Sequence, residues 1–246
     1  MTIVVALACV DGVILASDSQ ATEADSSRRS VQKVFPLTDT SLWAGSGSAA
    51  IIQEIADSIR TSTALANSPR PENSLLSLVR PALKRHYDNF LQAPGAPPAS
   101  PMTDVLSCGM RDGRPWVYEI DRYCQFTCYT EPGFHTIGSG APMAQLASEL
   151  MAHFDLPGKP VPYGLLVAYR SLDAIIRRSA FGVGGDIQMW VVDSDGQRQI
   201  DVTELRALGD RVEIWRSAEI ETLEELMAGA PAPAGEPLPE PMAEEP

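Results

Sequence analysis

The first 18 residues contain two strand-like apolar runs with a turn between them, and this pattern constrains the fold more than any other in the chain. The runs are TIVVALA (residues 2–8) and VILASD (residues 13–18), and Asp11-Gly12 lies between them. An Asp-Gly pair between two such runs is a strong signal for a β-hairpin. We therefore expect the chain to open with two antiparallel strands.

Thr2 follows the initiator Met1 directly and opens the first run. A threonine hydroxyl is a weak nucleophile until a base takes its proton, and a threonine that becomes the first residue carries such a base as its own α-amino group. That amine has a reference pKa of about 7.7–8.0. Removal of Met1 by a methionine aminopeptidase would expose Thr2. A threonine in this position is also common in chains where it has no function.

Hydrophobic periodicity and turn signals predict the remaining elements. Further strands are expected at residues 30–37, 41–45, 104–110, 116–119, 125–130, 134–137 and 186–193, with another after 194–196. Helices are expected at residues 48–66 (Ser48 as N-cap), 73–91 (kinked or broken at Pro81), 142–154, 163–179 and 203–227. Residues 23–29 and 92–101 are expected to be irregular. This order of strands and helices indicates an α+β domain.

Four short segments, in order, resemble proteasome β-type subunits, with features of the bacterial HslV-type peptidases. They are residues 2–22, VQKVFPL (31–37), LWAGSGSAA (42–50) and HTIGSGAPMAQLASELM (135–151). The resemblance extends from Thr2 to about Val192. It implies a four-layer αββα sandwich of two stacked antiparallel sheets, the N-terminal-nucleophile hydrolase fold. It also implies a threonine-type endopeptidase.

The resemblance assigns five catalytic positions. Thr2 matches the nucleophile, and Lys33 matches a lysine whose charge lowers the pKa of the threonine amine. Asp18 matches the aspartate that pairs with this lysine. Gly45 matches the glycine whose N–H stabilises the oxyanion, and Ser139 matches a serine near the amine. Taken alone, Lys33 is more readily explained as an edge-strand lysine that deters aggregation, and the alternative for Asp18 is an ordinary turn aspartate.

The same resemblance places Trp43, Ala44 and Thr22 at substrate-binding positions, although Trp43 is equally plausible in the core. One departure concerns the positions at which proteasome β-subunits commonly carry a supporting Asp and Ser. This chain has Ala180 and Val183 there, ahead of Gly184-Gly185.

Composition excludes several classes of function. The net charge is −13, and residues 217–246 contain eight Glu and no Lys or Arg, which leaves −5 for the rest. Binding to nucleic acid or to an anionic membrane needs clustered basic charge, so neither is expected. No apolar run reaches the length of about 20 residues that a membrane span requires, and no signal peptide is recognisable, so we expect a cytoplasmic location.

The cysteines and the C-terminal segment give the remaining expectations, on metal binding and on domain boundaries. Cys9, Cys108, Cys124 and Cys128 are expected to be buried free thiols, and the spacing of Cys124, Cys128 and His135 fits no standard zinc pattern, so no metal is expected. No other cofactor is implied. We expect one hydrolase domain at residues 1–227 and a disordered tail at 228–246, which is rich in Pro, Ala and Glu.

These observations favour a peptidase that hydrolyses peptides or unfolded proteins inside a self-assembled ring. A separate ATP-dependent unfoldase is a possible partner, because the sequence has no Walker-type phosphate loop. Two alternatives stay open. One is a non-catalytic ring or scaffold homologue, which the residues at 180 and 183 favour. The other is an amidase that acts on a small molecule with the same nucleophile.

Overall fold

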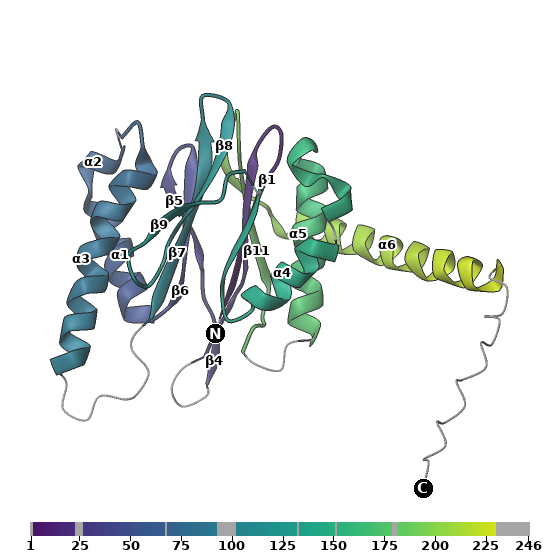
Figure 1. The fold of residues 1–246 in the computed structure, drawn as a ribbon, viewed down its shortest axis with the longest axis horizontal. Coiled ribbons are helices and arrows are strands. Elements are labelled where there is room, and N and C mark those ends of the chain that lie inside the picture. Colours follow the sequence, from purple (N-terminus) through teal and green to yellow (C-terminus); the bar gives the residue numbers. More distant parts are fainter. Residues whose placement is uncertain are drawn as a thin grey trace, which may run out of the picture.

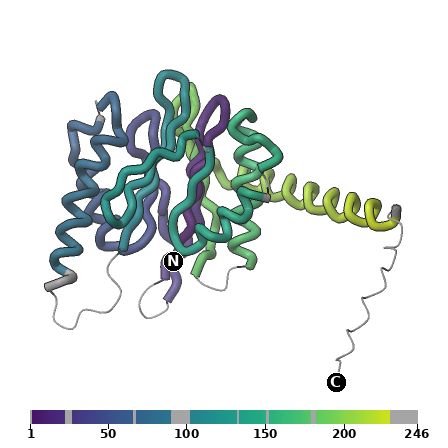
Figure 2. Tube along the Cα trace, in the orientation of Figure 1, coloured from purple at the N-terminus to yellow at the C-terminus, as the bar shows by residue number. Residues whose placement is uncertain are grey.

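The chain folds into four layers, two of helices and two of antiparallel strands (Figure 1). The computed structural model describes residues 2–22, 27–66, 68–92, 102–131, 133–150, 152–178 and 182–229. The predicted four-layer αββα sandwich is confirmed. In Figure 2 the N-terminal strands lie in the middle of the molecule, with helices on both sides.

The first sheet contains the predicted N-terminal hairpin as its centre. Its strand order is β10 (Phe134–Gly138), β1 (Ile3–Ala8), β2 (Val13–Asp18), β11 (Ile187–Asp193) and β12 (Gly196–Gln199). In the hairpin Val5 lies opposite Ala16. Every residue of β1 and β2 is buried, because both faces of this sheet are covered. This burial explains why the two runs are apolar throughout and do not alternate with polar residues.

The second sheet has the order β5 (Val34–Thr38), β6 (Ser41–Gly47), β7 (Thr103–Arg111), β8 (Arg114–Ile120) and β9 (Phe126–Cys128). A separate two-stranded ribbon joins β3 (Gln20–Thr22) to β4 (Arg28–Ser30). The ribbon lies partly within a stretch that we expected to be irregular. Its three pairs are too few to leave a periodic signal in the sequence.

Helices cover the outer face of each sheet. The second sheet is covered by α1 (Ala49–Thr61), α2 (Thr63–Ala66) and α3 (Pro71–Gln92), and the first by α4 (Ala141–Leu150) and α5 (Val161–Arg178). Two 3₁₀ turns, Ala152–Phe154 and Leu156–Gly158, connect α4 to α5. The last helix, α6 (Val202–Gly229), packs against α5 and then extends away from the body (Figure 1).

Three apolar cores separate the four layers. Alternate residues of β1 belong to two of these cores. Ile3, Val5 and Leu7 pack toward α4 and α5, whereas Val4 and Ala6 pack between the sheets. The third core joins the second sheet to α1 and α3. Strand β1 is therefore held from both sides, which fixes the position of Thr2 immediately before it.

Three helix predictions need correction. The expected helix at 48–66 is interrupted at Ser62, which has an extended backbone and separates α1 from α2. Ser48 has the backbone of an N-cap but its hydroxyl caps nothing. Helix α3 continues past Pro81, which is exposed and leaves the helix unbroken. The expected helix at 142–154 ends as α4 at Leu150.

The two halves of the C-terminal helix α6 differ in the burial of their apolar residues. Leu208 and Val212 in its first half are buried, and Leu208 belongs to the apolar core that includes α5. In its second half the side chains of Ile220, Leu223, Leu226 and Met227 are 59–67% exposed. No helix in the described part of the chain has the length and hydropathy to cross a membrane. Because α6 includes Ala228 and Gly229, the expected tail overlaps it by two residues. Residues 230–246 lie outside the described chain, so the disordered tail stays a prediction.

Candidate active site

Thr2 is held at the start of β1 by the turn Gly138-Ser139-Gly140. Its backbone nitrogen donates to the Ser139 hydroxyl oxygen at 3.2 Å, and its carbonyl oxygen accepts the Gly140 N–H at 3.3 Å. In the unprocessed chain this nitrogen is the peptide amide that follows Met1. Gly138 has a φ of +98°, and a Cβ there would lie 2.2 Å from the Thr2 carbonyl oxygen, so this position requires glycine. The structure therefore brings Thr2 and Ser139 together.

Asp18 ends β2 beside Thr2, and its carboxylate is completely buried. One oxygen accepts the Ile3 N–H at 3.0 Å and the Lys33 ammonium at 2.6 Å. The other accepts the Gly184 N–H at 3.0 Å. A buried carboxylate is stable only with such donors. The Asp18 carboxylate therefore links three segments of the chain, through Ile3, Lys33 and Gly184.

Lys33 lies immediately before β5, and its side chain is 6% exposed. Burial lowers the pKa of the Lys33 ammonium below its ordinary value, against the opposing attraction of Asp18. Burial therefore outweighs the ion pair at this lysine. The backbone of the segment is fixed by Gln188, whose side chain accepts the Lys33 N–H at 2.9 Å and donates to the Val31 carbonyl at 2.7 Å.

Gly45 lies in β6 and is packed closely by α1. A Cβ at Gly45 would approach the Ile52 side chain at 2.9 Å, so the residue has a packing reason to be glycine besides any role in catalysis. The next residue, Ser46, is buried, and a Cβ at Gly138 would lie 2.9 Å from its hydroxyl oxygen. The end of β6 therefore adjoins the turn that holds Thr2, and the oxyanion role of Gly45 stays a prediction.

The three expected substrate-binding residues occupy different environments. Trp43 is 1% exposed, stacks on Phe35 with ring centroids 5.1 Å apart, and belongs to the core beneath α1 and α3. This position favours the core alternative for Trp43. Ala44 is buried between the two sheets, and Thr22 is exposed on the β3–β4 ribbon. Their roles in binding stay predictions.

The segment before β11 contains support for Asp18 that the sequence did not reveal. Val183 is buried in the apolar core, and Ala180 lies outside the described residues. Gly184 donates its N–H to Asp18 and its carbonyl accepts the Gln20 N–H. The pair Gly184-Gly185 was visible in the sequence as a turn signal, but a main-chain donor leaves no side-chain signature. Nothing in the sequence marked Gln188.

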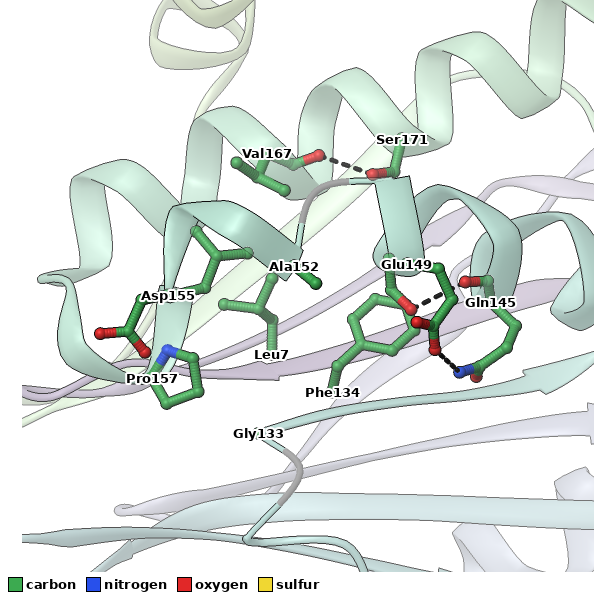
Figure 3. A pocket seen from close by; sticks show the side chains of 12 residues that line it. Leu7, Gly133, Phe134, Gln145, Glu149, Ala152, Asp155, Pro157, Val167 and Ser171 are labelled. Atoms are coloured by element: carbon green, nitrogen blue, oxygen red, sulfur yellow. Dashed lines mark hydrogen bonds between the residues drawn. The ribbon is translucent and has the colours of Figure 1, made fainter.

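The cavity in Figure 3 lies elsewhere. It has a volume of about 240 Å³ and is enclosed by the far part of β1, the start of β10, α4 and α5, with Leu7, Phe134 and Val167 in its wall (Figure 3). Leu7 is at the end of β1 away from Thr2, so this cavity is no part of the Thr2 site. Among the described residues no group of three or more His, Cys, Asp or Glu side chains is arranged to hold a metal ion.

The four cysteines are free, but they differ in exposure. Cys9 and Cys108 are buried as expected, whereas Cys124 is half-buried and Cys128 is exposed. Cys128 lies on β9, at the edge of the second sheet, where one side has no neighbouring strand in the described chain. The prediction of buried thiols was therefore wrong for Cys128.

Comparison with known proteins agrees with the fold. The model of the family described as "Proteasome subunit" matches residues 2–191. The proteasome subunit beta of Methanosarcina barkeri is 24% identical over 84% of this chain and 93% of its own length. Proteasome subunit beta 1 of Thermococcus kodakarensis is 29% identical over 84% of this chain and 96% of its own length.

Two solved structures share the fold. One is the helical assembly of the Anbu complex from Pseudomonas aeruginosa, with a TM-score of 0.74, 18% identity, and coverage of 95% of this chain and 98% of that one. Another is Anbu, an ancestral β-subunit, from Yersinia bercovieri. It has 17% identity and a TM-score of 0.70, and the match covers 94% of this chain and 98% of that one. Because the family model covers well over half of the sequence, this chain is a member of the proteasome subunit family.

Proposed function

We propose that the chain is a threonine-type endopeptidase that hydrolyses peptide bonds inside a self-assembled ring chamber. Thr2 is the nucleophile, and removal of Met1 converts its nitrogen from an amide to the free amine that acts as general base. The Thr2 hydroxyl oxygen attacks the scissile carbonyl carbon while its proton passes to that amine, directly or through a water. The protonated amine then supplies a proton to the departing amine of the substrate, and water hydrolyses the resulting ester.

The other four residues act around this step. The Lys33 ammonium disfavours a second positive charge nearby and so keeps the threonine amine neutral. Asp18 holds Lys33 in place. The Gly45 N–H stabilises the oxyanion, an interaction worth about 2.7–4 kcal/mol in other hydrolases. Ser139 holds the nitrogen of Thr2. Trp43, Ala44 and Thr22 are the proposed substrate-binding residues, Thr22 being the most accessible of them.

One observation carries this proposal: the buried Asp18–Lys33 ion pair at the start of β1. Burial of two charges costs several kcal/mol per ion, and a pair of apolar residues in the same space is often at least as stable. An ion pair that adds little to stability is reasonably explained by chemistry at the adjacent Thr2. The pair is linked to Thr2 through the Ile3 N–H.

Assembly is proposed on the exposed side chains of α6. Monomeric proteins seldom expose contiguous large apolar patches, and such patches commonly mark contacts with other molecules. Four large apolar residues of α6 lie within one stretch of eight residues and are more than half exposed. A ring formed by copies of this chain would bury them. The proposed location is the cytoplasm, and a separate ATP-dependent unfoldase is a proposed partner.

A specific observation favours a second candidate, a non-catalytic ring subunit of the same fold. Val183 stands where a supporting polar residue is common in the family, and its side chain is buried among apolar neighbours. It therefore gives the nucleophile no hydrogen bond. A small-molecule amidase with the same nucleophile stays a third candidate.

The intact mass of the purified assembly tests the proposal. We expect the mass to lack Met1 and to increase by one adduct per chain after treatment with a peptide epoxyketone, which reacts with both the hydroxyl and the amine of an N-terminal threonine. A Thr2→Ala variant is the matched control and should gain no adduct. Loss of Met1 without any adduct, in an assembled ring, would support the non-catalytic candidate.

A further inference from the structure

A groove on the outer side of the second sheet lies between the C-terminal half of α3 and the turn that joins β8 to β9. It has a volume of about 320 Å³. Its lining includes Lys84 and Tyr87 from α3, Arg122 and Tyr123 from the turn, and Met102. The side chains of Tyr87, Tyr123 and Met102 are 51%, 73% and 41% exposed, respectively. We call these five residues the tyrosine groove.

The wall that carries Tyr123 is built as a rigid turn. The Asp121 side chain accepts the N–H groups of Tyr123 and Gln125, and its carbonyl accepts the Cys124 N–H. Cys124 has a φ of +61°, and its side chain is packed against the core beneath α3. Tyr123 is therefore presented to solvent by a backbone that is already fixed, which reduces the entropy lost on binding.

The rim is fixed as well. The Arg122 guanidinium makes a two-pronged ion pair with Asp104, through Nη2 at 2.6 Å and Nε at 3.1 Å. The Nη1 of Arg122 also lies 2.7 Å from the Met102 sulfur. Lys84 pairs with Asp88 at 2.7 Å on the exposed face of α3, and at that exposure the pair is weak enough to exchange partners. Aromatic walls suit an extended, proline-rich segment, and Lys84 is the cation of the rim that an acidic residue of such a segment can recruit from Asp88.

The chain itself contains such a segment after α6. Residues 230–246 include six Pro and four Glu, no Lys or Arg, and two large apolar residues, Leu238 and Met242. Proline-rich sequences favour the polyproline II conformation, and grooves lined by aromatic side chains bind that conformation at low entropic cost. We propose that residues 230–246 of one copy dock in the tyrosine groove of a neighbouring copy, with Leu238 between the two tyrosines and a glutamate near Lys84.

Reach favours a neighbouring copy over the same chain. Leu238 is nine residues beyond Gly229, a separation of at most about 28 Å in the polyproline II conformation. Helix α6 leaves the body on the α5 side, whereas α3 covers the opposite outer face (Figure 1). To reach the groove of its own copy, the segment after α6 would first run back about 25 Å along the 17 helical residues that follow Val212. It would then cross the layers of the body, a further distance of about 30 Å. The sum of these two distances exceeds the span. Leu238 can therefore reach only the groove of a neighbouring copy that lies within this span of Gly229. This docking rests on the ring proposed above.

Photo-crosslinking in the full-length chain tests the docking. Benzoylphenylalanine replaces Leu238, or Ala232 as a control in the same segment, and the crosslinked peptides are identified by mass spectrometry. We expect Leu238 to crosslink to peptides that contain Tyr87, Met102 or Tyr123, at least fivefold more than position 232. In a mixture of ¹⁴N and ¹⁵N copies the crosslinked peptides should carry mixed labels.

Variants of the groove provide the matched controls. Tyr87→Ala and Tyr123→Ala should each lower the yield at least fivefold, whereas Tyr163→Ala, an equally exposed tyrosine on α5, should not. Lys84→Glu and an increase of salt from 0.05 to 0.5 M should also lower the yield. Crosslinks at another surface, crosslinks within a single copy, or a yield that Tyr87→Ala leaves unchanged would overturn the proposal. If native mass spectrometry finds only monomers, both the ring and the docking are wrong; an assembled chain without these crosslinks contradicts the docking alone.

Discussion

The two ends of the described chain differ in how much of their apolar surface is buried. From Ile3 to Asp18 the strands are enclosed by the rest of the protein, and even the carboxylate of Asp18 finds three donors within the chain. In the second half of α6 the large apolar side chains face solvent. The N-terminal strands are therefore buried within one copy, whereas the exposed surface of α6 is the proposed contact with another molecule. Substitutions at the two ends should consequently affect different properties.

The largest effect is expected from Thr2→Ala, which should abolish peptide hydrolysis while fold and assembly stay intact. The described contacts of Thr2 are made by its backbone, so the loss of its hydroxyl removes no structural partner. Turnover of a fluorogenic peptide and native mass spectrometry measure the two properties. Residual turnover within tenfold of the wild type would exclude Thr2 as the nucleophile.

Lys33→Ala should be nearly as inactive as Thr2→Ala, and Lys33→Arg should fail as well. The site around the ammonium is 6% exposed, and a planar guanidinium does not reproduce a compact ammonium in so closed a space. Peptide turnover by assembled protein is the measurement, with Lys84→Arg on the exposed face of α3 as the matched control. Full activity of Lys33→Arg would show that positive charge alone is sufficient.

Asp18→Ala should reduce the free energy of unfolding by about 3–5 kcal/mol, the range for removing one partner of a buried ion pair. The change leaves the Lys33 ammonium buried without its carboxylate and the N–H groups of Ile3 and Gly184 without an acceptor. Urea unfolding measures it. The double variant Asp18→Ala, Lys33→Met should recover part of the loss, because it removes the unpaired charge. A single variant that loses less than about 1 kcal/mol would mean that solvent reaches the pair.

The stability contribution of Lys33 should depend on alkaline pH. Burial lowers the pKa of Lys33 in the folded chain below the ordinary value of 10.5. Between these two pKa values the unfolded chain binds more protons than the folded one, so stability rises with pH. We expect the unfolding free energy of the wild type to rise relative to Lys33→Met as the pH approaches 10.5 from below. A difference that stays flat or falls between pH 8 and 10 would contradict this direction.

The smallest effect on stability is expected from Leu223→Ser combined with Leu226→Ser. Both side chains are 60% or more exposed, so the free energy of unfolding of the body should change by no more than about 0.5 kcal/mol. Assembly should nevertheless weaken, because the burial of each leucine in an interface contributes about 1.5–3 kcal/mol. Native mass spectrometry at several concentrations measures the assembly. A lower unfolding free energy with unchanged assembly would mean that α6, like the N-terminal end, stabilises the single copy and not the assembly.

The sequence predicted the parts of this protein that depend on local pattern. The Asp11-Gly12 turn and its flanking runs gave the central hairpin, and the resemblance placed Asp18 and Lys33 together. The environment of Trp43 was beyond the sequence, because an apolar residue in a strand suits a pocket and a core equally. The Gly184 N–H was equally invisible, since a main-chain donor has no residue signature and lies 166 positions from its acceptor. The break at Ser62 and the continuity of α3 past Pro81 depend on packing.

The separation between Asp18 and Gly184 has a consequence for the order of events during synthesis. A ribosome adds about 5–20 residues per second, so Gly184 is made about 8–33 s after Asp18. Throughout that interval Thr2 is already part of the nascent chain, but the carboxylate next to it lacks one of its three donors. The late position of this glycine thus delays completion of the proposed site until most of the domain has been translated.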